Sequence, residues 1–133
     1  FSCPPYGDLE VYSDDASDLS NMSHSEFKEI YERIIYWGIN YLKKDRFAAF
    51  VVGDFRNKSG HYRNFVSDTI KAFELAGARL YNEGILVTSV GSGSMRANRV
   101  FSAGRKFVKT HQNVLVFVKG DWKKAAAACR GEE

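Results

Sequence analysis

The sequence predicts an α/β fold built on a mostly parallel sheet. Segments with strand-like and helix-like patterns alternate along the chain, which is typical of parallel α/β domains. Residues 47–52 are apolar without interruption, as expected of a strand that is buried on both faces. Gly53-Asp54-Phe55-Arg56 follows at the carboxyl end of this strand, where α/β folds place ligands. With 133 residues, the chain forms one domain at most.

The first helix is predicted to begin at Ser23 and to run to about Lys44. Ser23 can cap the helix, and Glu26 three residues later completes a capping box. The apolar residues that follow recur at helical spacing and are expected to face the core. They are Phe27, Ile30, Tyr31, Ile34, Gly38, Tyr41 and Leu42.

A second amphipathic helix is predicted over residues 62–73, and Gly77 ends it. The remaining segments are a strand within residues 78–90, a Gly/Ser/Arg-rich loop over 91–111, a last strand over 113–118 and a frayed Ala-rich tail over 121–133.

Positive charge is concentrated in the second part of the chain. Residues 1–83 carry a net charge of −3, and residues 84–133 carry +6. Between Gly84 and Gly120 there are six Lys and Arg residues and no acidic residue. This distribution is compatible with a polyanionic partner and equally with a solvated basic surface.

Cysteine content and hydropathy narrow the class of protein. Cys3 and Cys129 are too few and too far apart to indicate a disulfide framework or a zinc site, so we expect no bound metal. No apolar run approaches the length of a membrane span, and no signal peptide is visible. The expected location is a reducing cytoplasm.

The most informative stretch is the N-terminal turn Cys3-Pro4-Pro5-Tyr6. Each proline fixes φ at about −65° and removes an N–H donor, so the turn presents carbonyl groups and an aromatic ring. The Pro4 carbonyl, the polar atom of Cys3 and the flat face of Tyr6 together suit a planar base with an exocyclic amine.

This tetrapeptide resembles motif IV of the S-adenosylmethionine-dependent amino-methyltransferases, in which Asp, Asn or Ser precedes Pro-Pro and an aromatic residue. Residues 2–15, 50–56 and 109–120 resemble a bacterial and phage branch of the DNA N4-cytosine/N6-adenine methylases, so the resemblance covers most of the chain. It implies the second half of a Rossmann-like class I methyltransferase sheet with an antiparallel last strand. Residues 1–120 would then form a partial catalytic domain and residues 121–133 a tail.

The resemblance also implies roles for the residues of the turn. Cys3 and the Pro4 carbonyl would hold the amine, Pro5 would stiffen the turn, and Tyr6 would stack on a base flipped out of DNA. Cys3 departs from the family pattern, and a thiol is a poorer acceptor than a carboxylate or a hydroxyl. Because Cys is isosteric with the Ser variant, it slightly favours N4-cytosine. The residues expected to contact DNA phosphates are Arg96, Arg99, Arg105, Lys106 and Lys109.

S-adenosylmethionine is the cofactor that the resemblance implies. Gly91-Ser92-Gly93-Ser94 is one candidate for the cofactor loop, but no acidic residue follows it until Asp121 to bind a ribose. We therefore expect the cofactor site to lie upstream of Phe1, in an N-terminal half of the same domain that this chain lacks. The chain reads as part of a longer protein from a bacterium or a phage-infected host.

Several alternatives remain open. The chain could be a nucleic-acid-binding fragment without catalysis, or an amino-methyltransferase that acts on RNA. Covalent attack by Cys3 on a pyrimidine is disfavoured, because the methyltransferases that use a nucleophilic cysteine have a proline before it, and Ser2 stands there instead. The turn could also be purely structural. Asp54 either caps a turn or contacts substrate, and His111 either contacts phosphate or only begins a strand.

Overall fold

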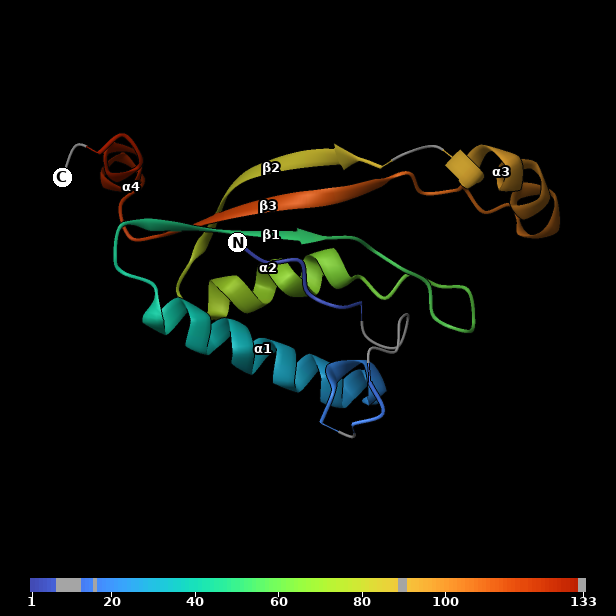
Figure 1. Cartoon of the computed structure of the whole chain (residues 1–133), viewed down its shortest axis with the longest axis horizontal. Helices are drawn as coiled ribbons and strands as arrows, with labels where there is room; N and C mark the ends of the chain where they lie inside the picture. Colours follow the sequence, from blue (N-terminus) through green and yellow to red (C-terminus); the bar gives the residue numbers. More distant parts are fainter. Residues whose placement is uncertain (7–12, 16, 89–90, 132–133) are drawn as a thin grey trace.

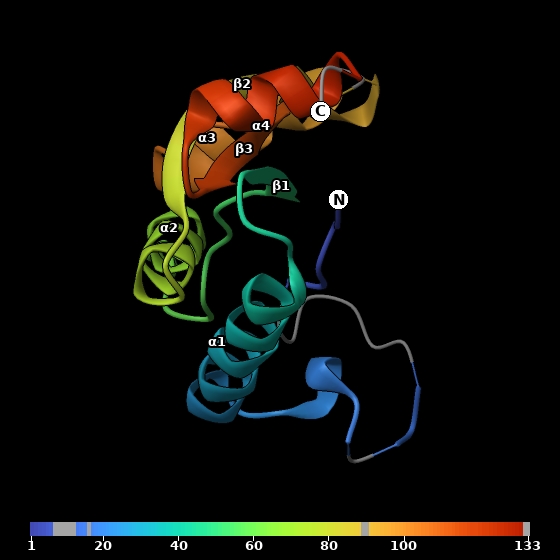
Figure 2. The same ribbon diagram turned by 90° about the vertical axis from the view of Figure 1, so that its left-hand side faces the viewer.

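The computed structural model of the chain describes residues 1–6, 13–15, 17–88 and 91–131. Two helices, α1 and α2, lie on one face of a three-stranded sheet, and α3 and α4 lie at its opposite ends (Figures 1 and 2). The elements are η2 (Leu19–Asn21), α1 (His24–Tyr41), β1 (Arg46–Val52), α2 (Phe65–Leu75), β2 (Arg79–Val87), α3 (Gly91–Gly104), β3 (His111–Lys119) and α4 (Trp122–Cys129). Asp8 and Glu10 lie outside the described residues.

The strand order is β1-β3-β2, and both outer strands run antiparallel to β3. The last strand is therefore antiparallel, as expected, but the mostly parallel sheet is not confirmed, because both named strand pairs are antiparallel. The described parallel pairing is a bridge between Ser2 and Phe50, in which Ser2 N–H donates to the Ala49 carbonyl at 3.0 Å. This topology brings the carboxyl ends of β1 and β2 and the amino end of β3 to the same edge of the sheet.

Helix α1 begins as the sequence predicts. Ser23 and Glu26 form a capping box, in which Ser23 N–H donates to the Glu26 carboxylate at 3.0 Å. The predicted apolar stripe is wrong in part: Ile34 is 49% exposed and Tyr41 is 83% exposed. The buried side chains instead follow an i, i+4 row, which faces α2 and the sheet. They are Phe27, Tyr31, Ile35 and Ile39.

Aromatic side chains fill the core between the helices and the sheet. The ring of Phe73 in α2 stacks on Phe117 of β3 with 3.8 Å between centroids. The buried hydroxyl groups of Tyr31 and Thr69 are 3.1 Å apart, and Thr69 donates to the Phe65 carbonyl. Because these polar atoms are paired, the core contains them without the cost of an unsatisfied buried group.

Two segments differ from the predicted loop and tail. The first 14 residues of the predicted 91–111 loop form α3; glycine and serine suggested a loop, but the helix contains good helix formers such as Met95, Arg96 and Ala97. The predicted frayed tail contains α4, because Asp121 caps it by accepting from the N–H groups of Lys123 and Lys124. Ala125 is fully buried against the sheet, so this helix packs onto the domain.

Lys119 joins the end of the sheet to α1. Its ammonium group donates to the carbonyl oxygens of Ile39 and Leu42, each at 2.7 Å. The last carbonyl groups of a helix have no hydrogen-bond donor within the helix. They also form the negative end of the helix dipole, which attracts the Lys119 ammonium group. None of the helices within the described ranges is both long and apolar enough to cross a bilayer.

Candidate functional site

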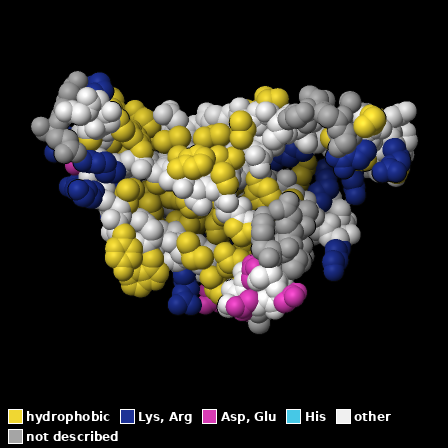
Figure 3. All heavy atoms as spheres, viewed as in Figure 1, with side chains coloured by type: hydrophobic (Ala, Val, Ile, Leu, Met, Phe, Trp, Pro, Cys, Tyr) yellow, Lys and Arg dark blue, Asp and Glu magenta, His cyan; other side chains and the backbone are white. Residues whose placement is uncertain are grey.

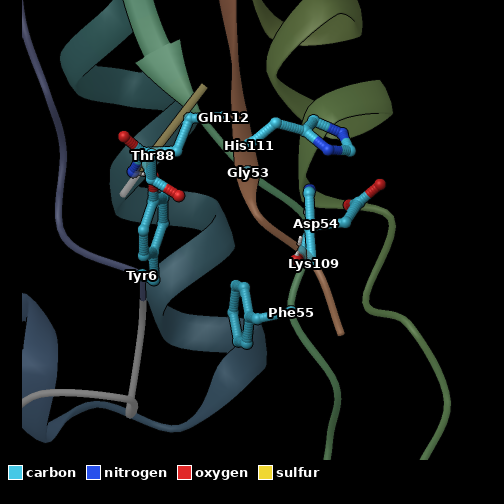
Figure 4. Close-up of a pocket in the computed structure, with 8 residues that line it drawn as sticks. All are labelled: Tyr6, Gly53, Asp54, Phe55, Thr88, Lys109, His111 and Gln112. Carbon is cyan, nitrogen blue, oxygen red and sulfur yellow. Dashed lines mark hydrogen bonds between the residues drawn. The ribbon is translucent and has the colours of Figure 1, made fainter. Parts of the chain in front are cut away.

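A cavity of about 340 Å³ lies at the edge of the sheet where β1 and β2 end and β3 begins. The segment that follows β1 was predicted to meet a ligand, and it does contribute to this cavity. Figure 4 shows Tyr6 on one side and Asp54, Lys109 and His111 grouped on the other. The lining residues are Tyr6, Gly53, Asp54, Phe55, Thr88, Lys109, His111 and Gln112.

Tyr6 is fixed in the cavity wall by three contacts. Its ring centroid lies 6.0 Å from that of Phe55 and 5.8 Å from that of Phe65, which meets it edge-on. The Gln112 side-chain amide donates a hydrogen bond to the Tyr6 hydroxyl. A Cβ built on Gly53 would lie 3.6 Å from the Tyr6 hydroxyl and 3.4 Å from Lys109 Nζ. The hydroxyl and the ammonium group therefore flank the same point of the β1 carboxyl end.

The other three residues of the predicted turn do not line this cavity. The Cys3 thiol is exposed and forms no disulfide, and Pro4 and Pro5 are half-buried. The structure thus places one of the four predicted catalytic residues, Tyr6, in the cavity wall. The roles of Cys3 and of the Pro4 carbonyl stay predictions.

Lys109 and Asp54 supply the charge of the cavity. Lys109 Nζ donates to the Asp54 main-chain carbonyl at 3.4 Å. Partial burial lowers the pKa of Lys109, and the negative charge of Asp54 opposes this shift. The Asp54 carboxylate accepts from Val66 N–H at 3.2 Å in the first turn of α2, which agrees with the capping alternative for this residue. His111 begins β3 and lines the cavity, and its contact with phosphate stays a prediction.

A second cavity of about 420 Å³ adjoins the first, and the two share Asp54, Lys109 and His111 as lining residues. Its walls include Tyr62 and Phe107, whose side chains are 42% and 80% exposed. The two cavities together form a concave surface along the edge of the sheet.

The predicted phosphate-binding residues lie at this end of the molecule, and Lys109 is the member of the set that lines these two cavities. Arg96 and Arg99 are exposed on α3, and the Arg105 guanidinium lies over the Phe101 ring at 5.2 Å. The Lys106 ammonium lies 3.0 Å from where a Cβ of Gly60 would be. Figure 3 shows Lys and Arg side chains gathered around α3, with another group near α4.

The hairpin that follows β1 is a part of the site that the sequence did not predict. Arg56 pairs with Tyr62 across it, and the Arg56 guanidinium lies 4.0 Å above the centre of the Tyr62 ring. The Arg56 guanidinium also donates to the Gly60 carbonyl at 2.8 Å, and Gly60 has a φ of +88° that favours glycine. The feature of the sequence that could have indicated this hairpin is the turn-forming run Asn57-Lys58-Ser59-Gly60, which lies between Arg56 and Tyr62.

The described residues do not fit the adenosine part of S-adenosylmethionine. Gly91–Gly104 forms α3, so the glycine-rich run follows β2 and opens a helix, as a nucleotide loop would. The first acidic residue that follows this run in the sequence, Asp121, lies at the opposite end of β3 and caps α4, so it cannot bind a ribose here. Nor do the described residues include a cluster of three His, Cys, Asp or Glu that could hold a metal ion.

No family model matches the sequence, and comparison with curated proteins finds no match. A solved structure with a similar fold comes from a Thermus thermophilus protein that is named, provisionally, as a DNA modification methylase. The TM-score is 0.58 at 14% sequence identity, over 74% of this chain and 38% of that one. The likeness shows a shared mixed α/β fold, and the chain spans well under half of its neighbour's length.

Proposed function

We propose that this chain forms the acceptor-base side of a DNA methyltransferase that modifies the exocyclic amine of cytosine (N4) or adenine (N6), with S-adenosylmethionine as methyl donor. The observation that carries the proposal is the position of Tyr6, in the wall of a cavity at the strand ends and opposite Lys109. The fold shared with a protein named as a DNA modification methylase supports the same class of activity.

The chemistry of the acceptor explains what the turn would do. An exocyclic amine is a poor nucleophile, because its lone pair is delocalised into the base. Two acceptors that bind its protons would make the lone pair available, and we propose the Cys3 sulfur and the Pro4 carbonyl for this role. Since neither residue lines the cavity, the amine must lie at the rim nearest the N-terminal turn, while the base stacks on Tyr6.

DNA would approach from the basic end of the molecule. We propose that Arg96, Arg99, Arg105, Lys106 and Lys109 contact phosphates and hold the duplex while the target base leaves it. Extruding a base costs a few kcal/mol, and stacking on Tyr6 together with these phosphate contacts would offset that cost.

The cofactor site belongs to another part of the protein in this proposal. The described residues do not fit the adenosine, and the chain covers only 38% of its structural neighbour. We propose that an N-terminal half of the domain supplies the cofactor site. The parallel bridge between Ser2 and Phe50 supports this arrangement, because it lies on the outer edge of β1, where further parallel strands of that half would be added.

The exposed position of Cys3 favours one alternative, a nucleic-acid-binding domain without catalysis. Methyl incorporation from labelled S-adenosylmethionine separates the two functions. The full-length protein should transfer labelled methyl groups to duplex DNA. Labelling of RNA and not of DNA would identify RNA as the substrate. Binding of DNA without any labelling would support the alternative.

A further inference from the structure

The second cavity combines exposed aromatic rings with positive charge, and the proposed function does not use it. Two aromatic residues from different segments line it. Tyr62 belongs to the hairpin after β1 (residues 56–62), and Phe107 belongs to the strap that joins α3 to β3 (residues 105–110). At 80% exposure, the Phe107 side chain leaves most of its apolar area in contact with water. A volume of about 420 Å³ lies within the range of roughly 300–1,000 Å³ that small-molecule sites occupy.

Both rings are held in place before any ligand binds. Arg56 lies over Tyr62 at 4.0 Å, and the hairpin is closed by a hydrogen bond from Asn57 N–H to the His61 carbonyl at 2.9 Å. Phe107 stacks on Phe101 of α3, with 6.0 Å between centroids and 17° between planes. Aromatic rings that are already fixed lose little conformational entropy when a planar ligand stacks on them.

Positive charge surrounds these rings. Lys109 lines this cavity, Arg56 is stacked on Tyr62, and Lys106 reaches over Gly60 from the strap to the hairpin. Asp54 is the one acidic residue among the described residues that line this cavity, and its carboxylate already accepts a hydrogen bond from Val66 N–H. Aromatic rings beside cations are the pattern that binds unpaired nucleotides, since the rings stack on bases and the cations meet phosphates.

The two cavities are neighbours, with Lys109 and His111 in the walls of both. A base in the first cavity and a base in the second would therefore lie on either side of Lys109. The phosphate that links two successive nucleotides would lie between them, within reach of the Lys109 ammonium group.

We propose that the second cavity is a nucleotide subsite that binds the unpaired base next to the target, stacked against Tyr62 and Phe107, with the linking phosphate at Lys109. The proposal rests on the proposed function for the identity of the neighbouring target base. Its ligand is a short single-stranded stretch of DNA, and base stacking gives it little preference for sequence.

The test is equilibrium binding of the full-length protein to a fluorescent ten-nucleotide DNA strand, compared with a ten-unit abasic strand of the same charge. The combined variant Tyr62→Ala/Phe107→Ala should bind the strand with bases roughly fivefold to 150-fold more weakly, because one base loses its stacking partners. It should bind the abasic strand as the wild type does. The conservative variant Tyr62→Phe should retain affinity.

Tyr41→Ala is the matched control, because Tyr41 is an exposed aromatic residue at the far end of α1. It should leave both affinities unchanged, and thermal melting checks that each variant is folded. Unchanged binding of the base-containing strand by the combined variant would overturn the subsite. An equal loss of affinity for the strand with bases and for the abasic strand would also overturn it. The two rings would then affect binding without contacting a base.

The subsite and the proposed function can fail independently. If the protein transfers no methyl group but the combined variant loses base-dependent binding, the subsite is supported and the methyltransferase is refuted. Methyl transfer to DNA together with unchanged binding by the combined variant would refute the subsite alone.

Discussion

We expect the hydroxyl group and the ring of Tyr6 to contribute separately to stability and to DNA binding, and two substitutions distinguish these contributions. Tyr6→Phe removes the hydroxyl group that accepts from Gln112 and keeps the ring against Phe55 and Phe65. Loss of one hydrogen bond should lower the free energy of unfolding by about 1 kcal/mol. Tyr6→Ala also removes the ring. Because replacing a fully buried Phe by Ala costs about 3–5 kcal/mol and Tyr6 is half-buried, we expect a total loss of about 2–3 kcal/mol.

Binding should follow the ring and not the hydroxyl group. In a duplex with 2-aminopurine at the target position, extrusion of that base raises its fluorescence. Tyr6→Phe should bind this duplex with near wild-type affinity, whereas Tyr6→Ala should lose about 1–3 kcal/mol of binding free energy. Urea unfolding measured by circular dichroism gives the stability of each variant. Stacking of a base on the Tyr6 ring is refuted if Tyr6→Ala binds as tightly as the wild type, or if Tyr6→Phe loses as much affinity as Tyr6→Ala.

Three further predictions concern charge. Changing Arg96, Arg99 and Arg105 together to Gln should reduce the slope of log affinity for DNA against log salt by up to about 2.7, and an unchanged slope would show that α3 does not face DNA. Lys119→Met should lower the free energy of unfolding, measured in urea, by about 2 kcal/mol, because it removes the charged hydrogen bonds to three carbonyls at the end of α1; a loss below about 0.5 kcal/mol would refute that role. Burial lowers the pKa of Lys109, so the folded state disfavours its ammonium form, and stability should rise with pH from the folded-state pKa to the ordinary lysine value. Lys109→Met should remove this rise and weaken DNA binding, and a variant that keeps the rise would exclude Lys109 as its cause.

The features that the sequence predicted correctly depend on neighbouring residues. The capping box of Ser23 and Glu26 spans three residues, so its pattern is visible without any knowledge of the fold. The choice between Ile34 and Ile35 for the core is different, because both lie near the apolar face and only the position of α2 decides which one is buried. In α3, the local composition was misleading, since glycine and serine at its start concealed a helix-forming run.

The cavity could be predicted only in part, for a physical reason. Asp54 was a candidate because it lies two residues after the end of an apolar strand. Gln112 was not, because a polar residue at the start of a strand gives no signal until its partner Tyr6, 106 residues away in the sequence, is placed beside it. The second cavity needs the hairpin and the strap together, and their contact is set by the antiparallel pairing of β1 with β3.

The most direct test of the central claim is the chemical identity of the methylated base. Duplex DNA is incubated with the full-length protein and S-adenosylmethionine, then digested to nucleosides and analysed by mass spectrometry. We expect a methyl group on an exocyclic amine, as N4-methylcytosine or N6-methyladenine, and its loss in Tyr6→Ala. Methyl groups at C5 of cytosine, or no methylated nucleoside at all, would contradict it.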